Sequence, residues 1–228
     1  MAALRTVIGW SCCAVSGVVG NRLRRSCHNC CQWRNRRAAG VPEADVTRRA
    51  AHEEKILRQL WQRRLLMPLV QPEGIYCFYS RQLVNALAAL IVKRTCLEIA
   101  AGDGTLTRFL AGSGVRITAT DDYSWKHEVK YPEFVVRKDA GEALREYAPE
   151  VVLCSWPPAG NAFEQQVFRT KSVQLYIVVS SRHRFAAGNW DDYQRQSAFE
   201  RGEDEALSSS VLPPELDAAV YLFRRKEV

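Results

Sequence analysis

The apolar residues of this chain fall into two recurring patterns after position 94. Short apolar runs, bounded by charges or turn residues, alternate with stretches in which apolar residues recur every three or four positions. The first pattern is typical of buried strands, and the second is typical of helices with one buried face. Buried strands are therefore predicted at residues 95–101, 115–120, 134–136, 151–154 and 173–179.

Helical spacing precedes and separates these strands. Helices are expected over residues 81–92, from 106 onward, over 162–168 and over 190–199. Ser80 is suited to cap the first of them, because a serine hydroxyl can accept a hydrogen bond from a backbone N–H of the first turn. Strands that alternate with helices indicate an α/β protein with a mostly parallel sheet.

The end of the chain predicts an antiparallel closing hairpin. Residues 201–205 are expected to form a polar turn, and residues 207–212 and 218–223 are expected to form the two strands. Pro213 and Pro214 lie between these strands. Such a pair would complete the mostly parallel sheet.

A glycine turn follows the strand at residues 95–101. Gly102 and Gly104 carry no Cβ, so the backbone can approach a ligand there, and the amides that open the next helix point toward it. A dinucleotide site needs a third glycine at position 107, where this chain has Thr107. A phosphate-binding P-loop needs Gly-Lys-Ser/Thr, which the sequence lacks. The turn therefore predicts a nucleotide-like ligand and argues against a dehydrogenase.

Residues 98–104 resemble motif I of the class I S-adenosylmethionine-dependent methyltransferases, an acidic residue followed by Gly-x-Gly-x-Gly. The matching positions are Glu98, Ala100, Gly102, Asp103 and Gly104, with Ala100 in place of the first glycine. The resemblance extends over about residues 75–228. It implies a class I methyltransferase fold, with a mostly parallel, twisted sheet of seven strands and helices on both faces. It also implies S-adenosylmethionine as the cofactor, whose sulfonium suits acidic surroundings.

The resemblance assigns roles to polar residues that follow the other strands. Asp121, with Asp122 as the alternative, takes the place of the carboxylate that binds both ribose hydroxyls. Asp139 takes the place of an acidic residue near the adenine amino group, and Ser155 lies at the motif IV position beside the transferable methyl group. In open α/β sheets, ligands bind at the carboxyl ends of the strands, where these residues are expected.

Motif IV is offset from the pattern of amino-group methyltransferases, which is Asp/Asn/Ser-Pro-Pro-aromatic. In this chain Trp156 precedes the two prolines and Ala159 follows them. Ser155 or Asn161 is the candidate polar contact for the acceptor. Trp156 is a candidate for stacking on a planar substrate, and the alternative is that it only closes the strand.

Two histidines are candidate bases, because an imidazole titrates near neutral pH. His183 follows the fifth strand and ranks ahead of His127, although a single histidine is more often a surface or packed residue. Tyr76 and Tyr79 precede motif I and are candidates for a wall of the cofactor site, with core packing as the alternative.

Three functions remain open from these residues, and one of them, a different nucleotide enzyme such as a dehydrogenase, is disfavoured by Thr107. The leading hypothesis is an S-adenosylmethionine-dependent methyltransferase whose acceptor, a small molecule or a protein, is not identified, with an amino group as one candidate. The alternative is a catalytically inactive methyltransferase-like module for binding or assembly, which the offset motif IV favours.

The first 42 residues differ sharply in composition from the rest. They hold seven arginines, no acidic residue and five of the eight cysteines. The other 25 basic residues are balanced by 25 acidic ones, so the whole formal charge of +7 lies in this segment. The neutral remainder gives no indication of a nucleic-acid-binding domain.

Four interpretations of residues 1–42 stay open. The first is a zinc site formed by Cys12, Cys13, Cys27 and Cys30. The second is a targeting segment, for a mitochondrion or another organelle, and the third is a signal peptide with residues 6–19 as its apolar core behind Arg5. The fourth is a disordered basic tail. The apolar stretch at residues 6–19 is too short to span a bilayer, and no transmembrane segment is predicted.

Residues 43–74 are expected to connect this segment to the sheet through a helix with one apolar stripe, which either packs over the domain or serves as a linker. Cys77, Cys96 and Cys154 lie in apolar contexts and are predicted to be reduced core thiols. Reduced thiols favour the cytoplasm.

Overall fold

The computed structural model describes residues 76–125 and 129–227. They belong to a unit that runs from Val70 to Val228. The predicted zinc ligands Cys12, Cys13, Cys27 and Cys30, the connecting helix and His127 lie outside the described residues.

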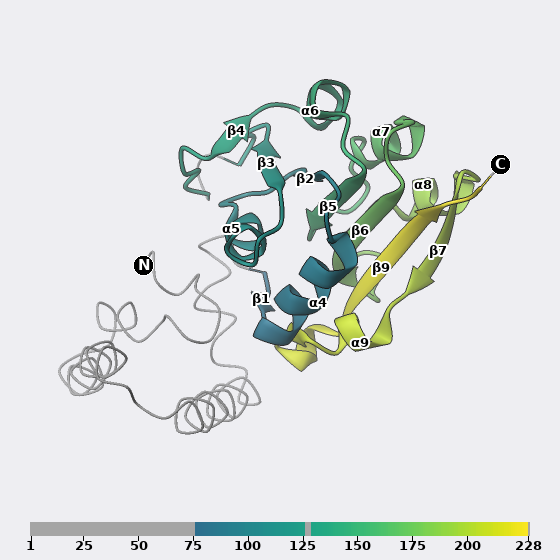
Figure 1. Ribbon diagram of the computed structural model, residues 1–228. Helices are drawn as coiled ribbons and strands as arrows, with labels where there is room; N and C mark the ends of the chain where they lie inside the picture. The colour runs from purple at the N-terminus through teal and green to yellow at the C-terminus, as the bar shows by residue number, and fades with distance from the viewer. Residues whose placement is uncertain (1–75, 126–128, 228) are drawn as a thin grey trace. The chain divides into compact units, whose positions relative to one another are not determined.

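A seven-stranded sheet forms the centre of the described unit, with the strand order β4-β3-β2-β5-β6-β9-β7 (Figure 1). The strands are β2 (Cys96–Glu98), β3 (Ile117–Asp121), β4 (Val135–Arg137), β5 (Val151–Ser155), β6 (Leu175–Ser181), β7 (Phe199–Glu203) and β9 (Ala218–Arg225). Strands β2 to β6 run parallel to one another, and β9 runs antiparallel to both β6 and β7. The expected mostly parallel sheet of seven strands, closed by an antiparallel pair, is confirmed.

Helices cover both faces of the sheet. They are α4 (Arg81–Ile91), α5 (Thr105–Gly112), α6 (Ala140–Tyr147), α7 (Glu164–Arg169), α8 (Trp190–Arg195) and α9 (Glu205–Ser208). Helix α4 packs against α5 and α9, and α6 packs against α7. The predicted cap of α4 is confirmed, because the Leu83 N–H donates to the Ser80 hydroxyl at 3.0 Å. Among the described residues, no helix has the length and apolarity needed to cross a membrane.

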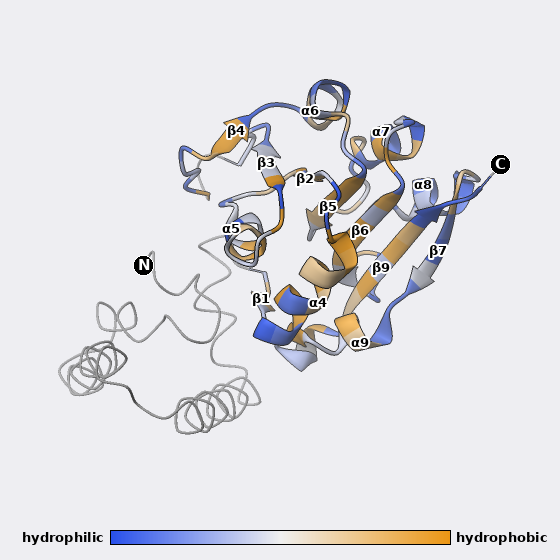
Figure 2. Cartoon of the chain, viewed as in Figure 1, coloured by the Kyte–Doolittle hydropathy of each residue, from blue (hydrophilic) through white to orange (hydrophobic). Residues whose placement is uncertain are grey.

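The central strands are apolar on both faces because helices cover both. Leu97, Val152, Tyr176 and Val178 belong to the core under α6, α7 and α8. Their neighbours in sequence point to the other face, since side chains alternate along a strand. Figure 2 shows this continuous apolar character in β5, β6 and β9, in contrast to the more polar β7 at the edge. Cys77, Cys96 and Cys154 are buried and free, as predicted.

The closing pair differs from the prediction. The expected polar turn at residues 201–205 overlaps β7, and β7 rather than residues 207–212 pairs with β9. An edge strand needs no apolar run, and only Phe199 of β7 is buried, so its sequence gave no sign of a strand. The helix expected over residues 190–199 ends at Arg195, which leaves Phe199 free to begin β7.

Residues 207–212 belong to two other elements. The first part lies in α9, and the second forms β8 (Val211–Leu212). Strand β8 pairs antiparallel with β1 (Phe78–Tyr79), so that Phe78 lies opposite Leu212 and Tyr79 opposite Val211. This small ribbon fixes the segment that precedes α4 and thereby positions Tyr79.

Candidate cofactor site

The strand order of the sheet reverses between β2 and β5. From β2 the chain continues outward to β3 and β4 on one side, whereas β5 and β6 lie on the other. Ligands of open α/β sheets bind outside the carboxyl ends of the strands at such a switch point. The glycine turn at residues 100–104 follows β2 at this place.

The turn depends on left-handed backbone at three positions. Ala100, Gly102 and Gly104 have φ values of 49°, 56° and 67°. A Cβ on Gly102 would meet nothing within 4 Å, so this glycine faces open space. A Cβ on Gly104 would lie 2.5 Å from the Phe134 ring and 2.8 Å from a Val135 methyl carbon. Position 104 therefore needs a glycine because it packs closely on the segment that enters β4. Only Gly102 is placed so that a ligand could approach the backbone.

Asp121 ends β3 next to this turn. The Gly102 N–H donates to its Oδ2 at 2.9 Å, and the Tyr123 N–H donates to its Oδ1 at 2.8 Å. Burial raises the pKa of Asp121, and these two hydrogen bonds oppose the shift. Asp122 is exposed and accepts a hydrogen bond from the Ser124 N–H at 2.8 Å. Of the two candidate carboxylates, Asp121 is the one joined to the glycine turn.

Glu98 is buried beneath the turn and contacts the helix that follows it. Its Oε2 accepts hydrogen bonds from the N–H of Thr107, at 3.0 Å, and from the Thr107 hydroxyl. Burial raises the pKa of Glu98 to about 8, with smaller contributions in the same direction from Asp103 and Asp121. With only 1% of the residue exposed, Glu98 supports the turn from below.

Asp103 and Asp139 both hold the beginning of a helix. Asp103 accepts hydrogen bonds from the N–H of Thr105 at 3.1 Å and from its hydroxyl at 2.7 Å. Asp139 is the N-cap of α6, a helix that the sequence analysis did not predict, and accepts from the Glu142 N–H at 3.0 Å. The turn therefore lies among several carboxylates, which favours a cationic ligand over a phosphate.

The motif IV position carries a pair of hydroxyl groups. The Tyr79 hydroxyl lies 2.7 Å from the Ser155 Oγ, so a residue before α4 contacts the end of β5. Burial raises the pKa of Tyr79 well above its usual value, and Glu98 and Asp103 act in the same direction. Both groups are therefore neutral hydroxyls, and together they have one O–H left to donate.

Trp156 and Asn161 make contacts within the protein. Trp156 has a φ of 53°, and its N–H donates to the Val179 carbonyl at 2.7 Å. Its indole Nε1 is buried and has no hydrogen-bond partner by distance and angle among the residues that the structure describes. The Asn161 amide nitrogen donates to the Pro158 carbonyl and to Glu164, at 2.8 and 2.7 Å. The Asn161 side chain therefore stabilises the loop in which Asn161 lies.

Glu164 is a buried carboxylate that the sequence analysis missed. No part of this residue is exposed. Besides Asn161, the hydroxyls of Tyr176 and Tyr193 donate to it at 2.5 Å each, and the Asn189 N–H donates at 2.8 Å. These donors come from the loop after β5, from β6 and from the start of α8. Its position in a short predicted helix did not indicate that Glu164 is buried, because its hydrogen-bond partners are far apart in sequence.

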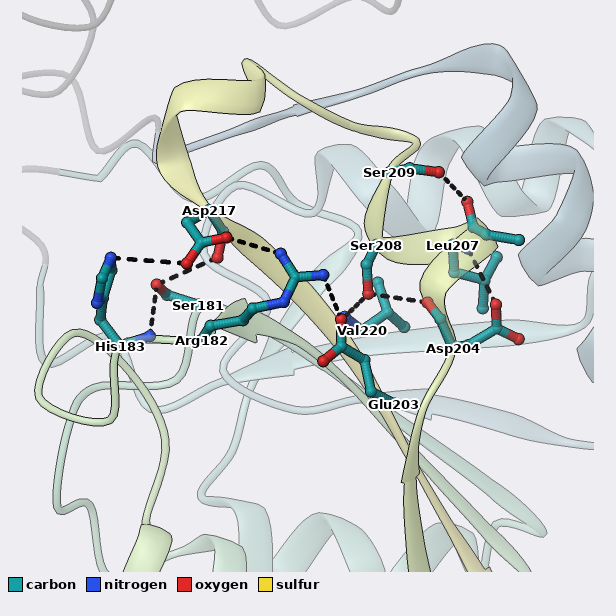
Figure 3. Close-up of polar contacts among 11 residues, drawn as sticks. Ser181, Arg182, His183, Glu203, Asp204, Leu207, Ser208, Ser209, Asp217 and Val220 are labelled. Atoms are coloured by element: carbon teal, nitrogen blue, oxygen red, sulfur yellow. Dashed lines mark hydrogen bonds and ion pairs between the residues drawn. The ribbon is translucent and has the colours of Figure 1, made fainter.

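His183 lies at the expected edge, beyond β6, in an exposed ion-pair group (Figure 3). Arg182 pairs with Asp217 at 2.7 Å and with Glu203 at 2.5 Å, and His183 Nε2 lies 3.7 Å from the other Asp217 oxygen. The His183 ring also stacks on Phe185. Among the described residues, no three His, Cys, Asp or Glu side chains are grouped so that they could hold a metal ion.

No protein-family model and no curated protein matches this sequence. Similar solved structures include the magnesium protoporphyrin IX methyltransferase of Synechocystis PCC 6803 with bound S-adenosylmethionine. It is 13% identical, with a TM-score of 0.41, over 64% of this chain and 79% of that chain. The tRNA (uracil-54, C5)-methyltransferase of Pyrococcus abyssi is 14% identical, with a TM-score of 0.43, over 63% of this chain and 37% of that one. The CurJ carbon methyltransferase is 11% identical, with a TM-score of 0.38, over 59% of this chain and 49% of that chain.

This chain has the class I methyltransferase fold. The observations that carry the assignment are the order of the seven strands, the antiparallel β9 between β6 and β7, and the glycine turn at the carboxyl end of β2. The matched region covers less than half of the tRNA methyltransferase and about half of the CurJ chain. The names of these proteins describe their own acceptors, which differ from one another.

Proposed function

We propose that this protein binds S-adenosylmethionine at the carboxyl ends of β2, β3 and β5 and transfers its methyl group to an acceptor. The observation that supports this most directly is the hydrogen bond between the Gly102 N–H and Asp121. It places a carboxylate beside the one glycine of the turn that faces open space. A carboxylate there can accept hydrogen bonds from a ribose, and the other acids around the turn suit a sulfonium.

The residues fit the cofactor in the following way. Asp121 would accept from the ribose hydroxyls, Gly102 would allow close approach, and Asp139 lies at the start of α6, on the side assigned to adenine. Ser155 would lie beside the transferable methyl group. The cofactor supplies an activated methyl group, and the protein's part is to hold the acceptor in line with it.

The acceptor is less well defined than the cofactor. An amino group would need hydrogen-bond acceptors at motif IV, but Asn161 is already bonded within its loop and Ser155 is bonded to Tyr79. The Tyr79 and Ser155 hydroxyls are therefore the groups available to orient an acceptor. A small molecule and a protein both remain candidate acceptors, and His183 remains the candidate base at the exposed edge.

A methyltransferase-like module without activity is the second candidate function. The motif IV side chains favour it, because Asn161 is bonded within its loop and the neutral Tyr79 and Ser155 hydroxyls include no base that could deprotonate a nucleophile. Both functions are compatible with cofactor binding, so binding and transfer need separate measurements. The cytoplasm stays the expected compartment, with an organelle as the alternative.

Calorimetric titration with S-adenosylhomocysteine tests the cofactor proposal. We expect binding by the full chain, and a loss of about 1.5–3 kcal/mol in Asp121→Ala, because hydrogen bonds to a charged group are removed. Asp122→Ala is the matched control and should bind normally, with circular dichroism to verify folding of both variants. No binding by the wild-type chain, or equal binding by both variants, would contradict the proposal.

Transfer of a labelled methyl group to components of a cell extract separates the two functions. A methyltransferase should label an acceptor in a manner that depends on Asp121. A protein that binds S-adenosylhomocysteine but labels nothing above the background of Asp121→Ala supports the inactive module.

A further inference from the structure

A turn with two exposed side chains follows β6, at the edge of the sheet where the candidate cofactor site lies. The Ala186 N–H donates to the His183 carbonyl at 2.9 Å, so Arg184 and Phe185 are the two central residues of the turn. Phe185 is 83% exposed, more than any other large hydrophobic residue that the structure describes. The His183 ring stacks on the Phe185 ring, with the centroids 5.5 Å apart. The turn therefore presents a supported aromatic ring to solvent.

The residues after this turn are joined to the motif IV loop. The Gly188 N–H donates to the Pro157 carbonyl at 2.9 Å, and the Gly160 N–H donates to the Gly188 carbonyl at 3.2 Å. The Asn189 amide nitrogen donates to the Asn161 carbonyl at 2.5 Å. The turn is therefore held beside the loop that the proposed function assigns to the methyl acceptor.

Trp190, at the start of α8, has two arginines over its ring. The guanidinium carbon of Arg184 lies 5.0 Å from the ring centroid, and that of Arg201 on β7 lies 5.3 Å from it. Neither arginine forms an ion pair with a described residue, whereas the neighbouring Arg182 has two carboxylate partners. Both guanidinium groups are therefore available to an anionic ligand, and arginine is well suited to phosphate.

These groups are spread over an open surface. Phe185 lies in an exposed turn after β6, and Arg201 lies on β7, two strands further along the sheet, which is about 10 Å at the usual spacing. A small molecule usually binds in a concave site that encloses most of its surface. A single-stranded nucleic acid instead lies across a surface, where its bases stack on aromatic rings and its phosphates contact basic side chains.

We propose that the turn at residues 183–186 and Arg201 form a binding surface for single-stranded nucleic acid, in which Phe185 stacks on a base and Arg184 and Arg201 bind phosphates. The inference rests on the proposed function in one respect, since it makes a nucleotide the methyl acceptor. The composition of the chain did not indicate this surface, because acidic residues elsewhere balance its arginines. An acidic peptide could pair with the arginines but has no base to stack on the exposed ring.

Fluorescence anisotropy with a labelled single-stranded RNA of about ten nucleotides tests the surface. All proteins compared are full chains in which the seven arginines of residues 1–42 are replaced by glutamine, so that this basic segment does not mask the surface. Phe185→Ala should weaken binding about tenfold, because the stacking of one base is lost. Arg184→Gln and Arg201→Gln should each reduce the slope of log affinity against log salt concentration by about 0.7, whereas Phe185→Ala should not change the slope.

Arg224→Gln is the matched control. Arg224 is exposed and follows Phe223, which lies opposite Arg201 in the sheet. Side chains alternate along a strand, so Arg224 points to the other face, and its loss should change neither the affinity nor the slope. Equal effects of Arg224→Gln and Arg201→Gln would mean that only net charge matters, and would overturn the inference. Binding that Phe185→Ala leaves unchanged, or equally tight binding of a polyglutamate peptide, would overturn it as well.

The anisotropy measurement, made with and without S-adenosylhomocysteine, distinguishes this inference from the proposed function. If the chain binds S-adenosylhomocysteine but not the RNA, the inference is wrong while the proposed cofactor stands. If it binds the RNA through Phe185 but does not bind S-adenosylhomocysteine, the nucleic-acid surface stands and the proposed function fails. In the cell-extract assay, nuclease should release the labelled methyl group. Label that only a protease releases would overturn the assignment of a nucleotide as the acceptor.

Discussion

Glu98 at the end of β2 is joined to Thr107 in the first turn of α5 by two hydrogen bonds to one carboxylate oxygen. Thr107 stands where a dinucleotide-binding turn has its third glycine. In this protein the side chain at that position is needed, because the Thr107 hydroxyl and the Thr107 backbone N–H are the only donors within the described residues that reach the Glu98 carboxylate. Thr107, which argued against a dehydrogenase because it replaces the third glycine, therefore has a structural role.

The buried Glu98 predicts a pH dependence of stability. Its pKa is raised from 4.5 to about 8, so between these values the folded protein binds more protons than the unfolded chain. The contribution of Glu98 to the free energy of unfolding is therefore largest at low pH and decreases as the pH rises through this range. The slope is at most about 1.4 kcal/mol per pH unit for one proton. Glu98→Gln should reduce this slope in urea unfolding measured from pH 5 to pH 8.

The exposed Glu133 provides the control for this measurement. Glu133→Gln should leave the pH dependence of unfolding unchanged. Equal slopes for wild-type protein and Glu98→Gln would mean that Glu98 is ionised in the folded state at neutral pH.

The two glycines of the turn should respond differently to the same substitution. In Gly104→Ala the new methyl group meets Phe134 and Val135, and the left-handed backbone adds strain, so we expect a loss of roughly 3 kcal/mol in stability. In Gly102→Ala only the strain of the left-handed backbone applies, so the free energy of unfolding should fall by about 1–2 kcal/mol. It should nevertheless weaken S-adenosylhomocysteine binding, because its methyl group enters the open side of the turn. Thermal unfolding and calorimetry on the same samples measure both effects, and equal destabilisation would contradict the packing argument.

The hydroxyl pair of Tyr79 and Ser155 predicts an energetic coupling between the segment before α4 and the end of β5. Tyr79→Phe, Ser155→Ala and the double variant form a double-mutant cycle. We expect a coupling of about 1 kcal/mol in the free energy of unfolding, the usual net contribution of a hydrogen bond. A coupling near zero would show that the two hydroxyls are bonded to water and not to each other.

Glu164 should be among the most sensitive positions of the fold. Glu164→Leu leaves the hydroxyls of Tyr176 and Tyr193 and two further donors without an acceptor, and we expect a loss of about 3–5 kcal/mol. Tyr176→Phe removes only one donor and should lose about 1 kcal/mol. Urea unfolding gives both values. A Glu164→Leu variant as stable as Tyr176→Phe would mean that water replaces the lost acceptor.

The zinc hypothesis for residues 1–42 leads to a metal analysis of the full-length chain. If Cys12, Cys13, Cys27 and Cys30 form the site, the purified protein should contain about one zinc ion per chain, and Cys27→Ser should lose it. Cys31→Ser is the control, since Cys31 is not one of the proposed ligands. A wild-type protein free of zinc after expression with added metal would leave the targeting segment, the signal peptide and the basic tail as the interpretations of this region.

The class of fold could be predicted because its signals are local. An apolar run followed by Gly102 and Gly104 indicates a strand and a turn in one stretch of sequence. Asp121 could be placed at a strand end because it directly follows the apolar run at residues 115–120. Buried parallel strands are apolar on both faces, so β2, β5 and β6 were visible without any knowledge of their neighbours.

The elements that were predicted wrongly lack such a local signal. Strand β7 is an edge strand with one buried residue, and its hydrogen bonds to β9 determine its conformation. The ribbon of β1 and β8 joins residues more than 130 positions apart, which no short pattern reveals.

The sequence by itself determined the α/β architecture, the glycine turn and the acids around it. Only the tertiary structure decided that Gly104 faces Phe134, that Asn161 holds its own loop and that Glu164 has four donors. The physical reason is that a buried polar group must find its partner wherever packing places one. That partner is set by the approach of elements in space and not by spacing along the chain.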